Sequence, residues 1–300
     1  MNESRRDIRV GGLIAFIGIF LFALSVPMTK WALESFNPYF TATGRACIAG
    51  VIALFIIGVR REKFLRKELR RPLFFTALGA VFGWPILIAL ALERTTSAHV
   101  SVIAAIMPLV TAVLAVLRRH QHVPAQFWFA AILGTVGLII FSITRSGFGQ
   151  SDPIADVLII GAVFFSSYCY VEGAILAREI PGWLVSSWIV LVTLPINIVA
   201  SIALWIFTHQ NYTITAHGII GLLYIGMFSM YFGFWFWYHG LARAGTVRGS
   251  QIQQLQALMT LAWSALLLGE SVTMVEIVAA LFVIFCVAWA QITSYRSATV

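Results

Sequence analysis

The stretch "RREKFLRKELRR" (60–71) contains seven lysine or arginine residues and separates two apolar runs, 39–59 and 72–92. A helix needs about 20 mostly apolar residues to cross the ~30 Å hydrocarbon core of a bilayer. Loops rich in lysine and arginine stay preferentially on the cytoplasmic side. The stretch therefore predicts two membrane-spanning helices joined by a cytoplasmic loop, and the topology of the remaining chain follows from it.

Composition places the whole chain in the membrane class. Hydrophobic residues make up 60% of the 300 residues and charged residues only 11%, whereas soluble domains average roughly half and a quarter. The apolar residues form continuous blocks, unlike the alternating segments of about ten residues in β-barrels. We expect an all-α integral membrane protein with ten transmembrane helices. The predicted spans are 10–29, 39–59, 72–92, 98–117, 125–144, 155–177, 183–207, 217–239, 249–269 and 274–294.

The basic residues predict the orientation of these spans. Ten spans put both termini on one side, and 16 of the 20 lysine and arginine residues fall on that side, against three on the other. Both termini are therefore predicted to be cytoplasmic. The net charge of +8 is chiefly this topology signal and also favours contact with anionic lipids. A nucleic-acid partner is disfavoured because the charges are divided among short loops.

An internal repeat at an offset of 149 residues organises the chain. The shift aligns "LERTTSAHVSVIAAIMP" (92–108) with "LARAGTVRGSQIQQLQA" (241–257). We predict two five-helix repeats, residues 1–149 and 150–300. Because five is odd, equivalent helices must run in opposite directions, as the basic loop 60–71 and its uncharged counterpart "THQNYTITAH" (208–217) indicate. Inverted repeats are typical of secondary transporters, although a duplication can also persist because it packs well.

The sequence resembles a known family at several motifs. "FALSVPMTKWALESFNPYFTATGRA" (22–46) is similar to the first two helices of the EamA branch of the drug/metabolite transporter superfamily, with Ser25, Lys30, Pro38 and Arg45 at the characteristic places. "ALLLGES" (265–271) matches the Gly-Glu that closes the ninth helix, whereas "RRHQ" (118–121) departs from the pattern. The resemblance covers nearly the whole chain.

The resemblance implies ten helices and export of amino acids, aromatic or other large neutral ones, across the bacterial inner membrane by alternating access. Export or uptake of another small metabolite or drug of the superfamily is the alternative. An intramembrane enzyme is disfavoured because neither HExxH nor GxSxG occurs, and a channel because no charged ring or filter motif occurs. Cys47, Cys169 and Cys286 lack metal-site spacing. We expect no metal and no cofactor, and nothing in the sequence fixes an oligomeric state.

Four glutamines in "QIQQLQ" (251–256) interrupt the ninth apolar run. A buried amide without a partner costs several kcal/mol, so these side chains need water, substrate or one another. On a continuous helix Gln251 and Gln254 share a face, and Gln254 aligns with Ala105 of the inverted partner helix, on the face that carries Ser101 and Pro108. We predict that this face lines a central cavity and binds the polar end of a substrate. Hydrogen bonding between helices is the alternative.

Aromatic residues form the second part of the predicted site. Within "YFGFWFWYHG" (231–240), Tyr231, Phe234, Trp235 and Tyr238 recur at helical spacing and form one stripe. With Trp84 and Tyr168, this stripe would wall a cavity for a solute with a large apolar side chain. Placement of these rings at the water interface is the alternative.

Two charged residues, Arg45 and Glu172, lie inside predicted spans, where a charge is a functional candidate by default. Arg45 is predicted to hold a substrate carboxylate or to organise the outer gate, unless its side chain extends to the interface. Glu172 is predicted to couple protons or, with Arg178, to form a structural tie. The complete predicted substrate-binding set is Ser25, Arg45, Trp84, Ser101, Tyr168, Tyr231, Trp235, Tyr238, Gln251 and Gln254.

Overall fold

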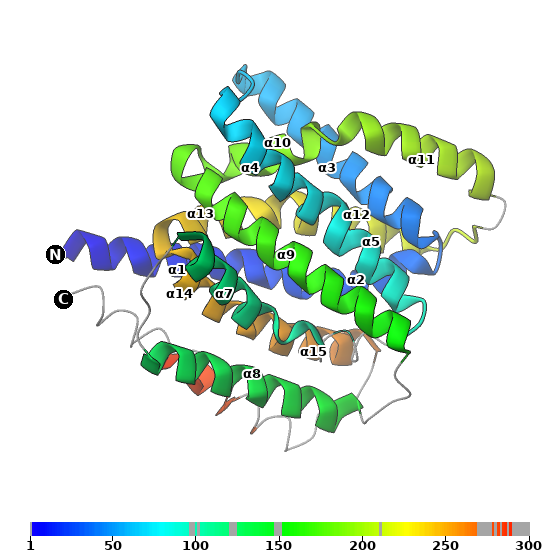
Figure 1. Cartoon of the computed structure of the whole chain (residues 1–300). Coiled ribbons are helices and arrows are strands. Elements are labelled where there is room, and N and C mark those ends of the chain that lie inside the picture. The colour runs from blue at the N-terminus through cyan, green and yellow to red at the C-terminus, as the bar shows by residue number, and fades with distance from the viewer. Residues whose placement is uncertain are drawn as a thin grey trace.

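The computed structural model describes most of the chain as helices, and within this described part no strand occurs (Figure 1). The all-α class predicted from composition is therefore confirmed for these residues. The described residues are 2–95, 100, 103–119, 125–146, 152–209, 212–268, 278, 281, 282, 284–286, 288 and 289.

Five segments are long and apolar enough to cross a membrane, and each coincides with a predicted span. A sixth span arises if α10 (Gly182–Leu191) and α11 (Leu194–Thr208), which meet at a bend of 47°, count as one. Two shorter apolar helices lie in Met107–Arg118 and Ala125–Gly137. A multi-span membrane architecture is confirmed, and the total of ten spans stays a prediction. The five long segments are Arg6–Leu33, Pro38–Arg60, Lys67–Leu92, Pro153–Glu179 and Ala216–Ala244.

The helices begin and end at the following residues. The first half contains α1 (Asn2–Ala23), α2 (Ser25–Leu33), α3 (Pro38–Arg60), α4 (Lys67–Ala77), the π-helix η1 (Leu78–Gly83), α5 (Trp84–Leu92), α7 (Met107–Arg119) and α8 (Ala125–Ser146). The second half contains α9 (Pro153–Glu179), α10, α11, α12 (Ala216–Tyr224), the π-helix η3 (Ile225–Gly233), α13 (Phe234–Ala244), α14 (Thr246–Ile252) and α15 (Gln254–Leu268).

Four helix breaks have a common cause in proline. The regular α-helix is interrupted at Leu24, in η1, at residues 105–106 and at residues 192–193. In each case a proline follows two or three residues later: Pro27, Pro85, Pro108 and Pro195. Proline has no N–H to donate, and its ring clashes with the carbonyl four residues earlier. The chain relieves the clash by breaking or widening the helix just before the ring.

Two kinds of irregular segment recur close to the offset of the predicted repeat. The π-helix η1 ends at Gly83 and η3 ends at Gly233, which are 150 residues apart. The turn at Ala105 and Ile106 likewise lies within two residues of the position that this offset pairs with the turn at Gln253, between α14 and α15. Because π-helical segments are rare, their matched positions set the third and eighth spans apart from the others as a structurally similar pair.

The order in which helices from the two halves touch gives their relative directions. Gly11 of α1 lies beside Ala244 of α13, and Gly18 lies beside Trp237, so these helices run antiparallel. Cys47 of α3 contacts Ser201 of α11 at 3.5 Å between Sγ and Oγ.

Near the other end of α3, the Arg60 guanidinium lies 4.5 Å from the Trp183 ring centroid of α10. The second and seventh predicted spans, which the predicted repeat pairs with each other, therefore also pack antiparallel (Figure 1).

The contact between α1 and α13 is made at backbone distance. A Cβ added to Gly18 would lie 2.8 Å from the Trp237 backbone nitrogen and 2.9 Å from the Gly233 carbonyl oxygen. Gly240 is equally constrained from the other side, since its Cβ would lie 2.4 Å from the Ala15 nitrogen. Glycine lets the two backbones approach closely, which is the usual basis of helix association in membranes. The two helices therefore pack at backbone distance along their glycine-bearing faces.

We expect Gly18→Ala to destabilise the protein by about 1–3 kcal/mol, because the added methyl group meets backbone atoms that cannot rotate away. The measurement is the thermal unfolding midpoint in detergent. Gly58→Ala is the matched control, since nothing lies within 4 Å of a Cβ there and alanine favours helix. Equal midpoints for the two variants would contradict the tight packing.

Candidate functional site

A buried polar cluster joins three elements in the interior of the helix bundle. The hydroxyls of Ser25 at the start of α2 and Ser229 in η3 lie 2.6 Å apart. Arg45 Nη2 in α3 donates to Ser229 Oγ at 3.0 Å. All three side chains are buried, and Arg45 is only 4% exposed. The cluster therefore holds an intramembrane guanidinium through hydroxyl groups.

The start of α3 fixes where Arg45 points. Asn37 caps the helix by accepting a hydrogen bond from Phe40 N at 2.8 Å, and Pro38 occupies the first helical position. Both features are favourable at a helix N-terminus. Arg45 follows two turns later, on the face that packs against η3.

Two adjacent cavities open beside this cluster. The first, which we call the polar cavity, has a volume of about 20 Å³. Its polar lining comes from Ser25, Arg45, Ser166, Ser229 and Gln256, and its aromatic lining from Phe22, Trp84, Tyr170 and Phe234. The second, the apolar cavity, has a volume of about 30 Å³ and shares Trp84 and Gln256 with the first. Its remaining lining is Val26, Val100, Ala104, Ala105, Met107, Pro108, Gln253 and Thr260.

The volumes show that this conformation is closed around the site. One water molecule needs about 10–15 Å³ of such space, so each cavity has room for about one to three waters. An amino acid needs several times more room. A solute of that size can enter only if the surrounding helices separate.

Two atoms in the lining of the polar cavity are buried and lack a hydrogen-bond partner among the described residues, Arg45 Nε and Gln256 Oε1. Arg45 also forms no ion pair with any carboxylate that the structure describes. Buried polar groups in folded proteins are almost always paired, and an isolated charge is costly to bury. The two unpaired atoms in one lining make this cavity the candidate binding site.

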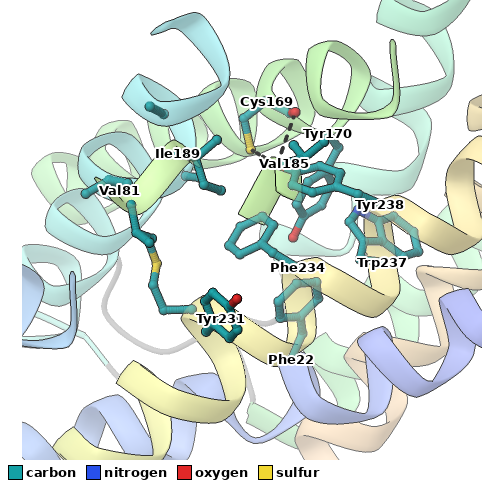
Figure 2. Close-up of a cluster of buried hydrophobic side chains, with 14 of the residues drawn as sticks. Phe22, Val81, Cys169, Tyr170, Val185, Ile189, Tyr231, Phe234, Trp237 and Tyr238 are labelled. Atoms are coloured by element: carbon teal, nitrogen blue, oxygen red, sulfur yellow. Dashed lines mark hydrogen bonds between the residues drawn. The ribbon is translucent and has the colours of Figure 1, made fainter. Parts of the chain in front are cut away.

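Aromatic rings form a packed layer next to the polar cavity (Figure 2). Phe22 and Phe234 from its lining meet edge to face at a centroid distance of 5.1 Å. Phe234 stacks on Tyr238 at 5.3 Å, and Tyr170 contacts Trp237 at 5.3 Å. The layer extends from Phe22 and Phe234 of the cavity lining into the protein interior.

The structure brings three of the ten predicted site residues to the cavities: Ser25, Arg45 and Trp84. Ser101 lies outside the described residues. The predicted aromatic stripe is divided because η3 has an i→i+5 hydrogen-bond pattern, which turns Tyr231 away from Phe234.

Tyr231 bonds to Ser187 of α10 at 2.8 Å between hydroxyl oxygens, and Trp235 stacks on its own neighbours Phe232 and Phe236. Tyr238 donates to the Cys169 carbonyl oxygen at 3.4 Å (Figure 2). None of these three side chains lines either cavity, and Phe234 is the member of the stripe that lines the polar cavity.

The glutamines that line the cavities are not the two that the sequence predicted. Gln254 Nε2 donates to the Ala131 carbonyl oxygen of α8 at 3.3 Å and to Gln251 Oε1 at 3.1 Å. This is the interhelical arrangement that was the alternative for this pair. Because the helix breaks at Gln253, the face predicted for a continuous helix is not the one presented, and Gln253 and Gln256 line the cavities instead.

Tyr168 also lies elsewhere, packed edge to face on Phe75 at a centroid distance of 6.0 Å. Its helix presents Ser166 and Tyr170 to the polar cavity instead. The sequence prediction missed these two, as well as Phe22, Ser229 and Gln256. The available signals were the i, i+4 spacing of Ser166 and Tyr170, and the single serine within the apolar run 218–235.

Glu172 has a different partner from the predicted one. Its buried carboxylate accepts a hydrogen bond from Arg118 Nε at 2.7 Å, so the ion pair ties α9 to the end of α7. The predicted tie with Arg178 is wrong, because Arg178 lies on the exposed side of α9. The Glu172 side chain is 2% exposed, whereas that of Arg118 is 54% exposed.

We expect Arg118→Ala to destabilise the protein by about 1–3 kcal/mol, because it leaves a buried carboxylate without its donor. Adding Glu172→Gln should recover part of this loss, which a double-mutant cycle on thermal unfolding in detergent measures. The control is Arg66→Ala, whose pair with Glu179 is solvent-exposed and spans 3.7 Å, and should cost under about 1 kcal/mol. Additive effects of the two substitutions at 118 and 172 would contradict the coupling.

The fold of this chain is shared by a protein of solved structure. A solved crystal structure superposes with a TM-score of 0.76 over 94% of this chain and 98% of the other, at 15% sequence identity. The chain belongs to the EamA-like transporter family, whose model matches residues 9–143 and 153–290.

Relatives bear names that agree with this family. The chain is 34% identical over 282 residues to the uncharacterized transporter YdeK of Bacillus subtilis (strain 168), covering 94% of this chain and 96% of that one. It is 22% identical to the uncharacterized transporter YyaM of the same organism, over 90% of each chain. It is also 22% identical over 165 residues to the S-adenosylmethionine/S-adenosylhomocysteine transporter of Chlamydia trachomatis serovar L2, covering 52% and 49%.

Proposed function

We propose that this protein is a secondary transporter that exports amino acids with aromatic or other large neutral side chains across the bacterial inner membrane by alternating access. Its membership in a transporter family supports the transport role. The substrate class rests on the chemistry of the closed central site, and on the resemblance of the sequence to the aromatic amino acid exporter YddG.

The observation that carries the proposal is the unpaired guanidinium of Arg45. An arginine inside a membrane costs several kcal/mol, and the described residues provide it with a hydroxyl, but with no carboxylate. A guanidinium matches the geometry of a carboxylate better than any other side chain does. A substrate carboxylate would supply the missing counter-charge and partner.

The remaining walls favour a substrate that also carries a large apolar group. Phe22, Trp84, Tyr170 and Phe234 line the polar cavity, and aliphatic side chains line the neighbouring one. Rings in such positions contribute large contact areas at low entropic cost. A carboxylate joined to an aromatic or branched side chain fits both properties.

Two inverted five-helix repeats, with both termini cytoplasmic, provide the mechanism that we propose. Three observations support this symmetry: the family model matches two successive stretches, the π-helices lie 150 residues apart, and the equivalent second and seventh spans pack antiparallel. Inverted repeats expose a midplane site alternately to either side when one bundle rocks against the other.

A second candidate is export of another metabolite that carries the same groups. The relative from Chlamydia trachomatis is named a transporter of S-adenosylmethionine and S-adenosylhomocysteine. Both compounds combine an amino acid head with an aromatic base, and so present the same chemistry to Arg45 and to the aromatic wall. The assay below separates the two candidates by including both solute types.

We expect Arg45→Gln to reduce counterflow of labelled phenylalanine in proteoliposomes at least tenfold, because the carboxylate loses its charged partner. Arg45→Lys should retain part of the activity, since a point charge remains. Arg94→Gln, which removes an arginine that pairs with Asp152 at the exposed end of α5, is the control. Undiminished phenylalanine counterflow in Arg45→Gln would refute the proposed site, and S-adenosylmethionine counterflow without phenylalanine counterflow would favour the second candidate.

The proposed topology predicts opposite labelling of two loops. In a background in which Cys47, Cys169 and Cys286 are replaced by alanine, Thr213→Cys should react with an impermeant maleimide added to intact cells. Glu62→Cys should react only after the membrane is opened, because its loop carries the basic residues. Both side chains are exposed in the structure. Labelling of Glu62→Cys in intact cells would contradict the orientation.

A further inference from the structure

We propose that Gln256 recognises the ammonium group of the substrate, so that the site selects α-amino acids over compounds that carry the carboxylate and side chain alone. The inference rests on the proposed function and adds a specificity determinant to it. In this arrangement Arg45 holds the carboxylate, Gln256 accepts from the ammonium group, and the apolar cavity receives the side chain.

Gln256 lies where the two cavities meet. Among the described lining residues, only Gln256 and Trp84 border both the polar and the apolar cavity. The Cα atom of an α-amino acid joins its carboxylate, ammonium group and side chain, so it belongs at such a junction. With the carboxylate at Arg45 and the side chain in the apolar cavity, the ammonium group lies next to a residue that lines both.

The hydrogen bonds of the lining leave the Gln256 side-chain oxygen without a partner. Ser25 and Ser229 are bonded to each other, and Ser229 also accepts from Arg45. Gln256 Oε1 is the one acceptor in the described lining that is buried and has no protein partner. It therefore complements Arg45 Nε, the donor without a partner in the same cavity.

The amide of Gln256 is neutral, which suits a site next to Arg45. No aspartate or glutamate is among the described residues that line either cavity. A carboxylate in this place would pair with Arg45 and compete with the substrate carboxylate. A neutral amide instead accepts from an ammonium group and leaves the guanidinium free.

Gln253 provides an internal contrast on the same helical segment. It lines only the apolar cavity, and both ends of its amide are engaged within the protein. Gln253 Nε2 donates to Met107 Sδ at 2.7 Å, and Thr111 Oγ1 donates to Gln253 Oε1 at 3.5 Å. Gln253 thus stabilises the contact with α7, whereas Gln256 has an acceptor to offer a ligand.

The test compares labelled phenylalanine with 3-phenylpropanoate, which lacks the ammonium group, in proteoliposomes containing the full chain. Gln256→Leu should lower phenylalanine transport roughly ten- to hundredfold, as expected when a hydrogen bond to a charged group is lost. The same variant should leave 3-phenylpropanoate transport unchanged or raise it. Gln253→Leu is the matched control and should change transport of the two solutes by the same factor.

The outcomes separate this inference from the proposed function. An equal loss for both solutes in Gln256→Leu, or no loss for phenylalanine, would overturn the role of Gln256 while leaving Arg45 in place. If 3-phenylpropanoate transport survives Arg45→Gln, the proposed carboxylate site itself fails. Should Gln256→Leu not fold, Gln256→Met keeps the length of the side chain without its acceptor and must give the same selectivity change.

Discussion

Inside a bilayer the backbone has to satisfy its own hydrogen bonds, and the architecture of this protein follows from that constraint. Irregular backbone is tolerated at membrane depth only where it is buried in protein or lines a cavity. Five helix breaks meet this condition, because each contains or adjoins a residue that lines one of the two central cavities. They lie at Leu24, in η1, in η3, at residues 105–106 and at Gln253. Proline explains three of these breaks. The same helix breaks therefore shape the cavity lining and bend the helices.

The second organising feature is a charge held by neutral partners. Arg45 is solvated by Ser229 and, through it, by Ser25, so the guanidinium is kept in place without being neutralised. Glu172 shows the opposite solution, because Arg118 pairs with it directly and leaves a structural tie between α9 and α7. The contrast distinguishes a charge that is available to a ligand from one that is already satisfied. Burial alone would have treated the two residues alike.

Sequence patterns predicted the elements well, and the site only in part. Span length and hydropathy reflect the lipid environment directly, and they therefore predicted the helical membrane class and the positions of the five long apolar helices. Ser25 was predicted from a family motif, Arg45 from its charge inside a span, and Trp84 as an aromatic residue suited to wall a cavity. The aromatic stripe and the glutamine face were derived from continuous α-helical geometry, which η3 and the turn at Gln253 interrupt. Helical periodicity cannot report a register change that arises from tertiary packing, so Gln254 was predicted where Gln256 lies.

The glycine-lined contact between α1 and α13 has a consequence for how the protein is made. The face of α1 that contains Gly11 and Gly18 pairs with residues 233–244, which leave the ribosome more than 200 residues later. During synthesis this face must remain against lipid or insertion factors while six intervening spans enter the bilayer, if the predicted order of spans holds. Assembly of the bundle therefore begins with unpaired helices and ends late, when the eighth predicted span arrives and docks on the first.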